Sequence, residues 1–217
     1  SVFKYDDYSL ADNLNKKGIS FLMFDNRGAH LVNKILVKKD GKQKKQLFGS
    51  CYENIKECIY DIDSAIEFMK SLDYSEIYLI GGSTGANKIC VYDHYRKKNG
   101  AKKYVLISGG DDIGYYIEKL GKEKYTMLLK QSAKKIKENK GEEIIEELLP
   151  TFFLSYKACF DLFNPDSDSN TFPFIDANSN KPMSKKPLFG YFSEISKPTL
   201  VIYPEEDESV GIGAASG

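Results

Sequence analysis

This sequence of 217 residues has little of what usually marks a nucleic-acid-binding protein. Only two of its basic residues are arginine, Arg27 and Arg96, and its 31 basic residues are balanced by 31 acidic ones. Arginine is the side chain best suited to bidentate phosphate recognition, and the net charge is zero. Nothing in the composition therefore favours a nucleic-acid partner. The lysines of residues 34–48 are expected to form a solvated surface.

Cysteine patterns and long apolar runs are also scarce. The four cysteines (Cys51, Cys58, Cys90 and Cys159) include no C-x-x-C pair and lie near no histidine cluster. We therefore expect neither a metal site nor a disulfide framework. No apolar run approaches the length of a membrane span, and no signal peptide is visible. These features predict free, buried thiols in a reducing compartment, and hence a cytoplasmic protein without a membrane span.

The sequence does contain enough apolar residues for a substantial core, with 41% hydrophobic and 13% aromatic residues. Short apolar runs alternate with amphipathic stretches, which predicts an α/β fold with a mostly parallel sheet and flanking helices. An Asp40-Gly41 turn predicts a hairpin over residues 34–48. We expect strands at residues 19–24, 77–80, 104–107 and 198–203, and helices at residues 10–17, 53–72 and 86–98.

Residues 111–190 interrupt this alternation and predict a helical cap inserted into the core. The core itself is expected to comprise residues 1–110 and 191–217. Helices are expected at residues 113–139, 142–149 and 151–163, followed by an irregular connection at 164–187. Most aromatic side chains of the insertion are expected to pack the cap onto the body, although they are also candidates for lining an acyl pocket.

A G-x-S-x-G motif, Gly81-Gly82-Ser83-Thr84-Gly85, lies between a predicted strand and a predicted helix. A sharp strand-to-helix turn projects the serine hydroxyl clear of the sheet, and it requires small residues two positions before and after the serine. The start of the helix offers unpaired N–H groups to negative charge, so the Thr84 amide is a candidate oxyanion donor. A structural glycine turn in another α/β fold remains an alternative. A phosphate-binding loop is not a good alternative, because Ala86, Asn87 and Lys88 do not fit the motif G-x-x-x-x-G-K-[ST].

With these residues in view, the chain resembles the α/β-hydrolase superfamily, most closely its esterase- and lipase-like branch. Residues 21–28 resemble the strand and D-x-R-G turn of the family, residues 81–85 its nucleophile elbow, and residues 201–208 its late strand with the acidic triad member. The resemblance implies Ser83 as nucleophile and Asp207 as the acid, although Glu205, Glu206 and Glu208 share that loop. It implies a mechanism that uses no metal or organic cofactor.

The departure from the family pattern is the histidine, because none follows Asp207. We expect that both termini of the natural protein are absent from this sequence and that the catalytic histidine lies beyond Gly217. His30 is a candidate for the pocket rim, whereas His94 is expected to face core or solvent. Arg27 is expected to pair with a carboxylate such as Asp25.

The predicted function is a serine hydrolase that cleaves a small to medium carboxylic ester or thioester through an acyl-enzyme on Ser83. Its partner would be that small-molecule ester. Three alternatives stay open: a ligand-binding protein on a hydrolase scaffold, an amidase or peptidase, and an acyltransferase that uses the same serine.

Overall fold

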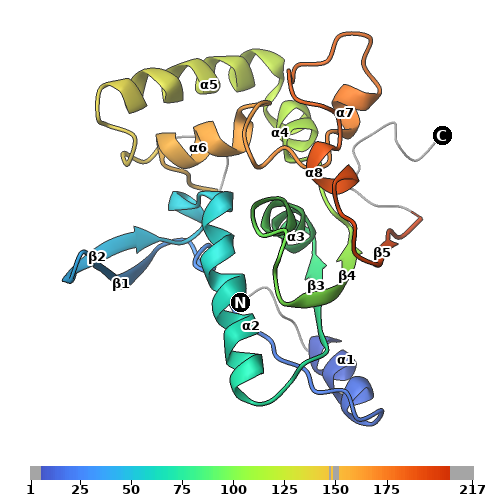
Figure 1. Cartoon of the computed structure of the whole chain (residues 1–217). Helices are drawn as coiled ribbons and strands as arrows, with labels where there is room; N and C mark the ends of the chain where they lie inside the picture. Colours follow the sequence, from blue (N-terminus) through green and yellow to red (C-terminus); the bar gives the residue numbers. More distant parts are fainter. Residues whose placement is uncertain (1–5, 147, 149–151, 206–217) are drawn as a thin grey trace.

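The structure is a computed structural model that describes residues 6–146, 148 and 152–205. Figure 1 shows a body built around a small sheet, a helical layer above it and a hairpin that projects from one side. The strands are β1 (Asn33–Lys39), β2 (Lys42–Phe48), β3 (Ile77–Gly82), β4 (Ala101–Ile107) and β5 (Thr199–Ile202). The α-helices are α1 (Asp6–Asn15), α2 (Cys58–Ser71), α3 (Thr84–Tyr95), α4 (Asp112–Leu120), α5 (Lys122–Lys137), α6 (Tyr156–Phe163), α7 (Phe174–Ala177) and α8 (Gly190–Ser193). Two 3-10 turns, η1 (Ser50–Tyr52) and η2 (Ile55–Glu57), precede α2.

The central sheet has three parallel strands in the order β3-β4-β5, which confirms the predicted α/β class with a parallel sheet. β1 and β2 form a separate antiparallel pair, as the Asp40-Gly41 turn predicts. Both turn residues have positive φ (52° and 76°), which is typical of a tight hairpin. Because β3, β4 and β5 run in the same direction, the loops that follow them all emerge at one edge of the sheet.

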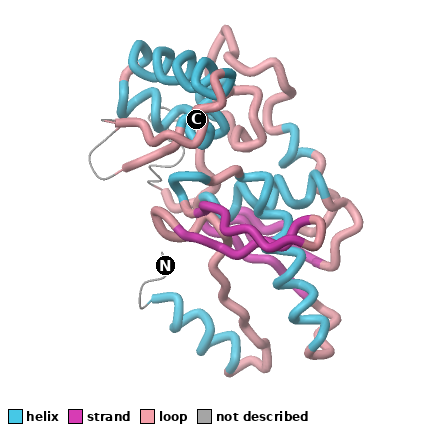
Figure 2. Tube along the Cα trace, turned by 90° about the vertical axis from the view of Figure 1, so that its left-hand side faces the viewer, coloured by secondary structure: helices cyan, strands magenta, loops and turns pink. Residues whose placement is uncertain are grey.

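One face of the sheet packs against α3, and α2 packs against α3 in turn (Figures 1 and 2). Alternate residues of β3 point into this core, where Ile77 and Leu79 are buried, while Tyr78 and Ile80 on the other face are 45% and 42% exposed. The composition of β5 predicts a buried strand, yet Leu200 is 57% exposed in the described part of the chain. The buried strand-and-helix core includes Ile59, Ile62, Ile66, Ile89, Val91, Tyr104 and Leu106.

The helices between β4 and β5 form a second core of their own. α5 packs along α6, and α4 contacts both of them. Tyr125, Tyr156 and Phe163 are buried in this core, as expected for packing side chains, whereas Tyr115 and Phe153 are 38% and 45% exposed. The second core comprises Ile113, Tyr125, Leu128, Ile145, Leu148, Leu154, Tyr156, Ala158, Cys159 and Phe163.

Three predicted elements are wrong. Residues 19–24 form no strand but an extended, partly exposed segment, since no described strand lies beside them to accept their backbone hydrogen bonds. The helix predicted over residues 113–139 breaks at Gly121, whose φ of 77° ends α4 and starts α5. The described part of residues 142–149 is not helical, because Ile144 instead forms a β-bridge with Ser155.

Among the described residues, no helix combines the length and the apolar character needed to cross a bilayer.

Candidate active site

Ser83 occupies a strained turn between β3 and α3. Its backbone has φ 52° and ψ −127°, a region that a residue with a side chain adopts only at a cost of about 1–3 kcal/mol. Its amide donates a hydrogen bond to the Ile107 carbonyl oxygen at the end of the neighbouring strand (2.8 Å). The residue is exposed. The serine is therefore held at the carboxyl edge of the sheet in a strained backbone conformation.

Close approach of strand and helix at this turn depends on Gly81. A methyl group on Gly81 would lie 2.5 Å from the Gly85 carbonyl carbon and closer still to its oxygen. Gly82 and Gly85 face open space, and a methyl group added to either would have no other atom within 4 Å. The motif predicts small residues at both Gly81 and Gly85. Contacts with neighbouring atoms require a small residue at Gly81 but not at Gly85.

The Thr84 amide lies where a helix leaves its N–H groups unpaired. Thr84 is the first residue of α3, so its N–H has no acceptor within the helix. The Ala86 amide, two residues later, donates to the Ser83 carbonyl oxygen (2.8 Å) and closes the turn. The positive end of the helix dipole is thus directed at the space beside Ser83.

The loop after β4 is fixed to this turn by a buried side chain, Asn87. Its amide nitrogen donates to the Gly110 carbonyl oxygen (2.9 Å), and its amide oxygen accepts from the Gly110 N–H (3.0 Å). Tyr203, just past β5, donates from its hydroxyl to the Gly109 carbonyl oxygen (2.7 Å). Asp111 then caps α4 through the Gly114 N–H (2.7 Å). The first turn of α3 and the end of β5 together hold the loop that leads to Asp112.

A cavity of about 160 Å³ lies beside the turn, between the sheet edge and the helices that separate β4 from β5. The segment between β4 and β5 contributes one aromatic wall, formed by Tyr116 and Phe152, whose rings stack with centroids 5.3 Å apart. The lining includes Glu53, Thr84, Asp112, Tyr116, Phe152 and Asp161. Two of the lining carboxyls are perturbed. Burial and the neighbouring Asp111 carboxylate raise the pKa of Asp112 to about 7, and burial raises the pKa of Asp161 to about 6.

The third carboxylate of the cavity, Glu53, is neutralised by Lys88 of α3. Lys88 Nζ lies 2.6 Å from Glu53 Oε1 and also donates to Asn26 Oδ1 (2.9 Å). Lys88 is only 7% exposed, so the carboxylate and the amide are what make burial of its charge tolerable. Glu53 packs directly over Gly28, where any side chain would collide with its carboxylate. Asn26 and Gly28 of this turn therefore support the cavity wall indirectly, through their contacts with Lys88 and Glu53.

Arg27 pairs with Asp61 of α2 and not with Asp25, which corrects the expectation from the sequence. Its guanidinium lies 2.9 Å from Asp61 Oδ1, and its backbone N–H donates to Asp61 Oδ2 (3.0 Å). The guanidinium also lies 5.2 Å from the ring centroids of Phe48 and Tyr60. Asp25, by contrast, is exposed at the surface. Arg27 thus has a structural role that ties the turn to α2.

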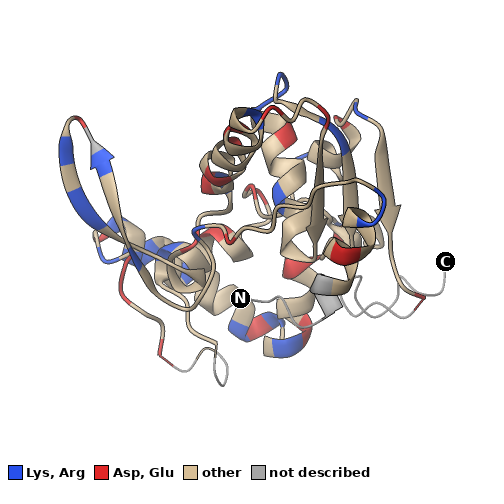
Figure 3. Cartoon of the chain, turned by 90° about the horizontal axis from the view of Figure 1, so that it is seen from below, with Lys and Arg blue, Asp and Glu red and all other residues tan. Residues whose placement is uncertain are grey.

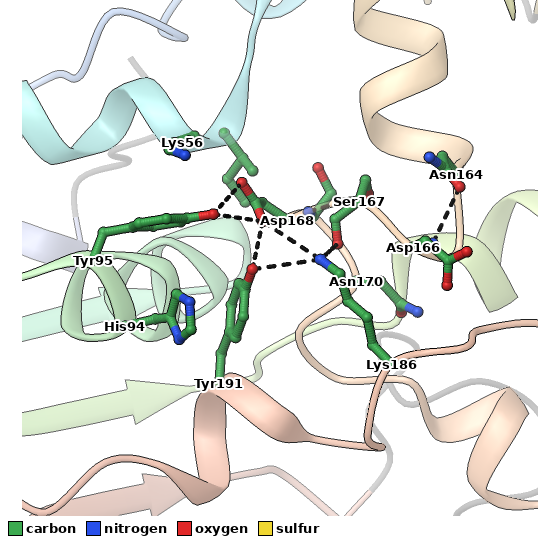
Figure 4. Close-up of polar contacts among 12 residues, drawn as sticks. Lys56, His94, Tyr95, Asn164, Asp166, Ser167, Asp168, Asn170, Lys186 and Tyr191 are labelled. Atoms are coloured by element: carbon green, nitrogen blue, oxygen red, sulfur yellow. Dashed lines mark hydrogen bonds and ion pairs between the residues drawn. The ribbon is translucent and has the colours of Figure 1, made fainter.

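His94 belongs to a different polar cluster, shown in Figure 4. Its Nδ1 lies 2.8 Å from Glu194 Oε2, and its ring stacks on Tyr191 with centroids 3.9 Å apart. Tyr191 and Tyr95 donate to the carboxylate of Asp168 (2.5 and 3.0 Å). This cluster fastens α8 and the segment after α6 to the far end of α3, more than two turns from Ser83. His94 is therefore not placed to act as the base.

Two site predictions remain, His30 and Asp207. His30 is exposed, with φ 64°, and is not among the residues that line the cavity. Asp207 lies outside the described residues, so its role as the acid stays a prediction. Both histidines of the sequence are thus accounted for, and neither lies at the cavity beside Ser83.

The fold and this turn define an α/β protein with a strained serine at the carboxyl edge of its parallel sheet. The chain belongs to the family described as "Protein of unknown function (DUF1749)", which matches residues 48–213. The matched range contains Ser83, the cavity carboxylates and the cap helices. No curated protein matches the chain.

Proposed function

We propose that this protein is a serine hydrolase of the α/β-hydrolase type, with Ser83 as its nucleophile. The observation that carries the proposal is the backbone of Ser83, held at φ 52° and ψ −127° between a parallel strand and a helix. A glycine turn that served only packing would gain nothing from strain at a serine. Strain at that residue is typical of a nucleophile elbow.

In the proposed reaction, the Ser83 hydroxyl attacks an ester carbonyl and transfers its proton to a histidine. The oxyanion that forms is stabilised by the Thr84 N–H and by a second donor. The histidine then protonates the leaving alcohol, and water releases the acyl group by the reverse sequence. Asp207 is proposed to orient that histidine, and neither His30 nor His94 is assigned this role. The chemistry proposed here uses no cofactor.

The cavity supports a small to medium acyl or alcohol group, because its volume is about 160 Å³. Tyr116 and Phe152 offer an apolar wall, and Thr84 connects the cavity to the serine turn. The helices between β4 and β5 would serve as the cap of the hydrolase fold. All four cysteines are free and buried, which supports the proposed cytoplasmic location.

The test is labelling with a fluorophosphonate probe of the protein expressed from its complete gene, beside Ser83→Ala and Ser108→Ala. Ser108 is a matched control, because it also follows a parallel strand with φ 52° but is followed by two glycines instead of a helix. Labelling that disappears in Ser83→Ala and persists in Ser108→Ala supports the proposal. Labelling that persists in Ser83→Ala refutes it.

Residues 1–217 expressed alone give a second, independent result. Because neither of their histidines lies at the cavity beside Ser83, we expect them to fold without measurable labelling or ester turnover. Turnover that depends on Ser83 in this chain would instead indicate His30 as the base. A folded, full-length protein that never labels would favour the ligand-binding alternative, which equilibrium binding of ester analogues would then test.

A further inference from the structure

The β1–β2 hairpin projects from the body beside α2 (Figure 1), and Figure 3 shows basic positions in blue along it. Its root is fixed. Phe48 is buried under Arg27, and the Gly49 and Ser50 amides donate to the Arg27 and His30 carbonyl oxygens (2.9 and 2.7 Å). A hairpin with such a root is a defined structure that extends into solvent.

The projecting part of the hairpin is basic. Asp40 is the only acidic residue between Asn33 and Phe48. None of the exposed lysines forms an ion pair with any described residue, so their charge is not compensated by the protein itself. These exposed lysines are Lys34, Lys38, Lys42, Lys44 and Lys45.

One face of the hairpin combines these charges with an exposed aliphatic side chain. The register pairs Lys34 with Leu47, Leu36 with Lys45 and Lys38 with Gln43, and directly paired residues share a face. Leu36 is 54% exposed and is flanked by three lysines: Lys34, Lys38 and Lys45. At the root, Leu31 and Val32 are exposed to 50% and 51%. We call Lys34, Leu36, Lys38 and Lys45 the hairpin face.

We propose that the hairpin face docks the protein on a membrane surface rich in anionic phospholipid. The lysines would contact the headgroup phosphates, and Leu36 would enter the boundary between headgroups and acyl chains. This inference does not depend on the hydrolase activity proposed above, because it rests on the hairpin alone.

The chemistry of the hairpin face favours a lipid surface over a nucleic acid. Its cations are all lysines, whereas base and phosphate recognition in nucleic acids draws on arginine forks. Phe48 is the only aromatic residue in either strand, and it is buried, so no ring is free to stack on a base. An exposed leucine among lysines gains little from a polar nucleic-acid backbone but gains apolar burial in a lipid interface.

The test is co-sedimentation of the full chain with vesicles of phosphatidylcholine alone or with about one-third phosphatidylserine. We expect binding only to the anionic vesicles, and we expect salt to weaken it because exposed charges are screened. Lys34→Gln/Lys38→Gln/Lys45→Gln should bind about 100-fold more weakly, at roughly fivefold per lysine. Leu36→Ser should bind about tenfold more weakly, with little effect of salt on the difference.

The matched control carries the same change of charge on α5, where Lys130, Lys134 and Lys137 are also exposed. Lys130→Gln/Lys134→Gln/Lys137→Gln should bind anionic vesicles as the unmodified protein does. The proposal is overturned if anionic vesicles do not bind, or if both triple variants lose binding equally. It is also overturned if the hairpin lysines bind duplex DNA or RNA, measured by fluorescence anisotropy, without binding vesicles.

Discussion

Replacing Gly81 by alanine tests whether strand and helix must touch at the serine turn. The added methyl would lie 2.5 Å from the Gly85 carbonyl carbon, whereas carbon atoms in contact normally lie about 3.5–4.0 Å apart. Relief requires movement of the backbone in the first turn of α3, not the rotation of a side chain. Overpacking usually lowers the free energy of unfolding by about 1–3 kcal/mol, and a clash with backbone belongs at the upper end of this range. We therefore expect Gly81→Ala to lose about 3 kcal/mol of stability.

For a chain of this size, that loss corresponds to a fall in Tm of roughly 6–12 °C, measured by circular dichroism or calorimetry. Gly85→Ala is the control, because its added methyl meets no atom within 4 Å and Gly85 is helical. It should leave stability unchanged or raise it by about 0.5–1 kcal/mol. A Gly81→Ala protein as stable as the unmodified one, or a Gly85→Ala protein equally destabilised, would show that strand and helix need not touch at Gly81.

Two further predictions concern the loop after β4. Because the pKa of Asp112 is raised from 3.8 to about 7, its neutral form stabilises the fold most at acidic pH, and this contribution is lost as pH rises through about 7. Asp112→Asn should therefore raise the free energy of unfolding by at most about 4 kcal/mol near pH 8 but only about 2 kcal/mol near pH 5, measured by urea unfolding at both values. A gain in stability that does not depend on pH would contradict a raised pKa for Asp112. Asn87→Ala leaves the Gly110 N–H and C=O without their partner and should lower the free energy of unfolding by about 2–4 kcal/mol in the same assay. A loss of stability below about 0.5 kcal/mol would mean that water replaces the amide.

The elements predicted well from the sequence are those whose signal is local. β3 and α2 have strong apolar periodicity, and the Asp40-Gly41 hairpin follows from turn chemistry at two residues. Residues 19–24 have strand composition, but a strand also needs a neighbour, which composition does not supply. Gly121 is a helix-ending residue inside a long periodic stretch, and its effect on the backbone outweighs that periodicity.

The residues of the candidate site also divide into those with a local signal in the sequence and those brought together by the tertiary fold. Ser83 and Gly81 are found from a five-residue motif, because the turn and its chemistry lie within those residues. Glu53 and Asp161 are more than a hundred positions apart and meet at the cavity only through the tertiary fold. Asp112 does carry a signal in the sequence, since an acidic pair a few residues after a strand lies at the edge where a parallel sheet places its ligands. Arg27 has several acidic residues within reach in sequence, and only packing selects Asp61.

The position of the cap within the chain also bears on how the protein folds. β4 and β5 are hydrogen-bonded neighbours, yet residues 108–198 separate them. Closing such a long loop has an entropic cost that must be met before the pairing contributes any stability. The helices between these strands have a core of their own, so their collapse would shorten the open part of that loop first. β5 would then join the sheet last, and mutations in the buried residues of α5 and α6 would slow its docking without touching either strand.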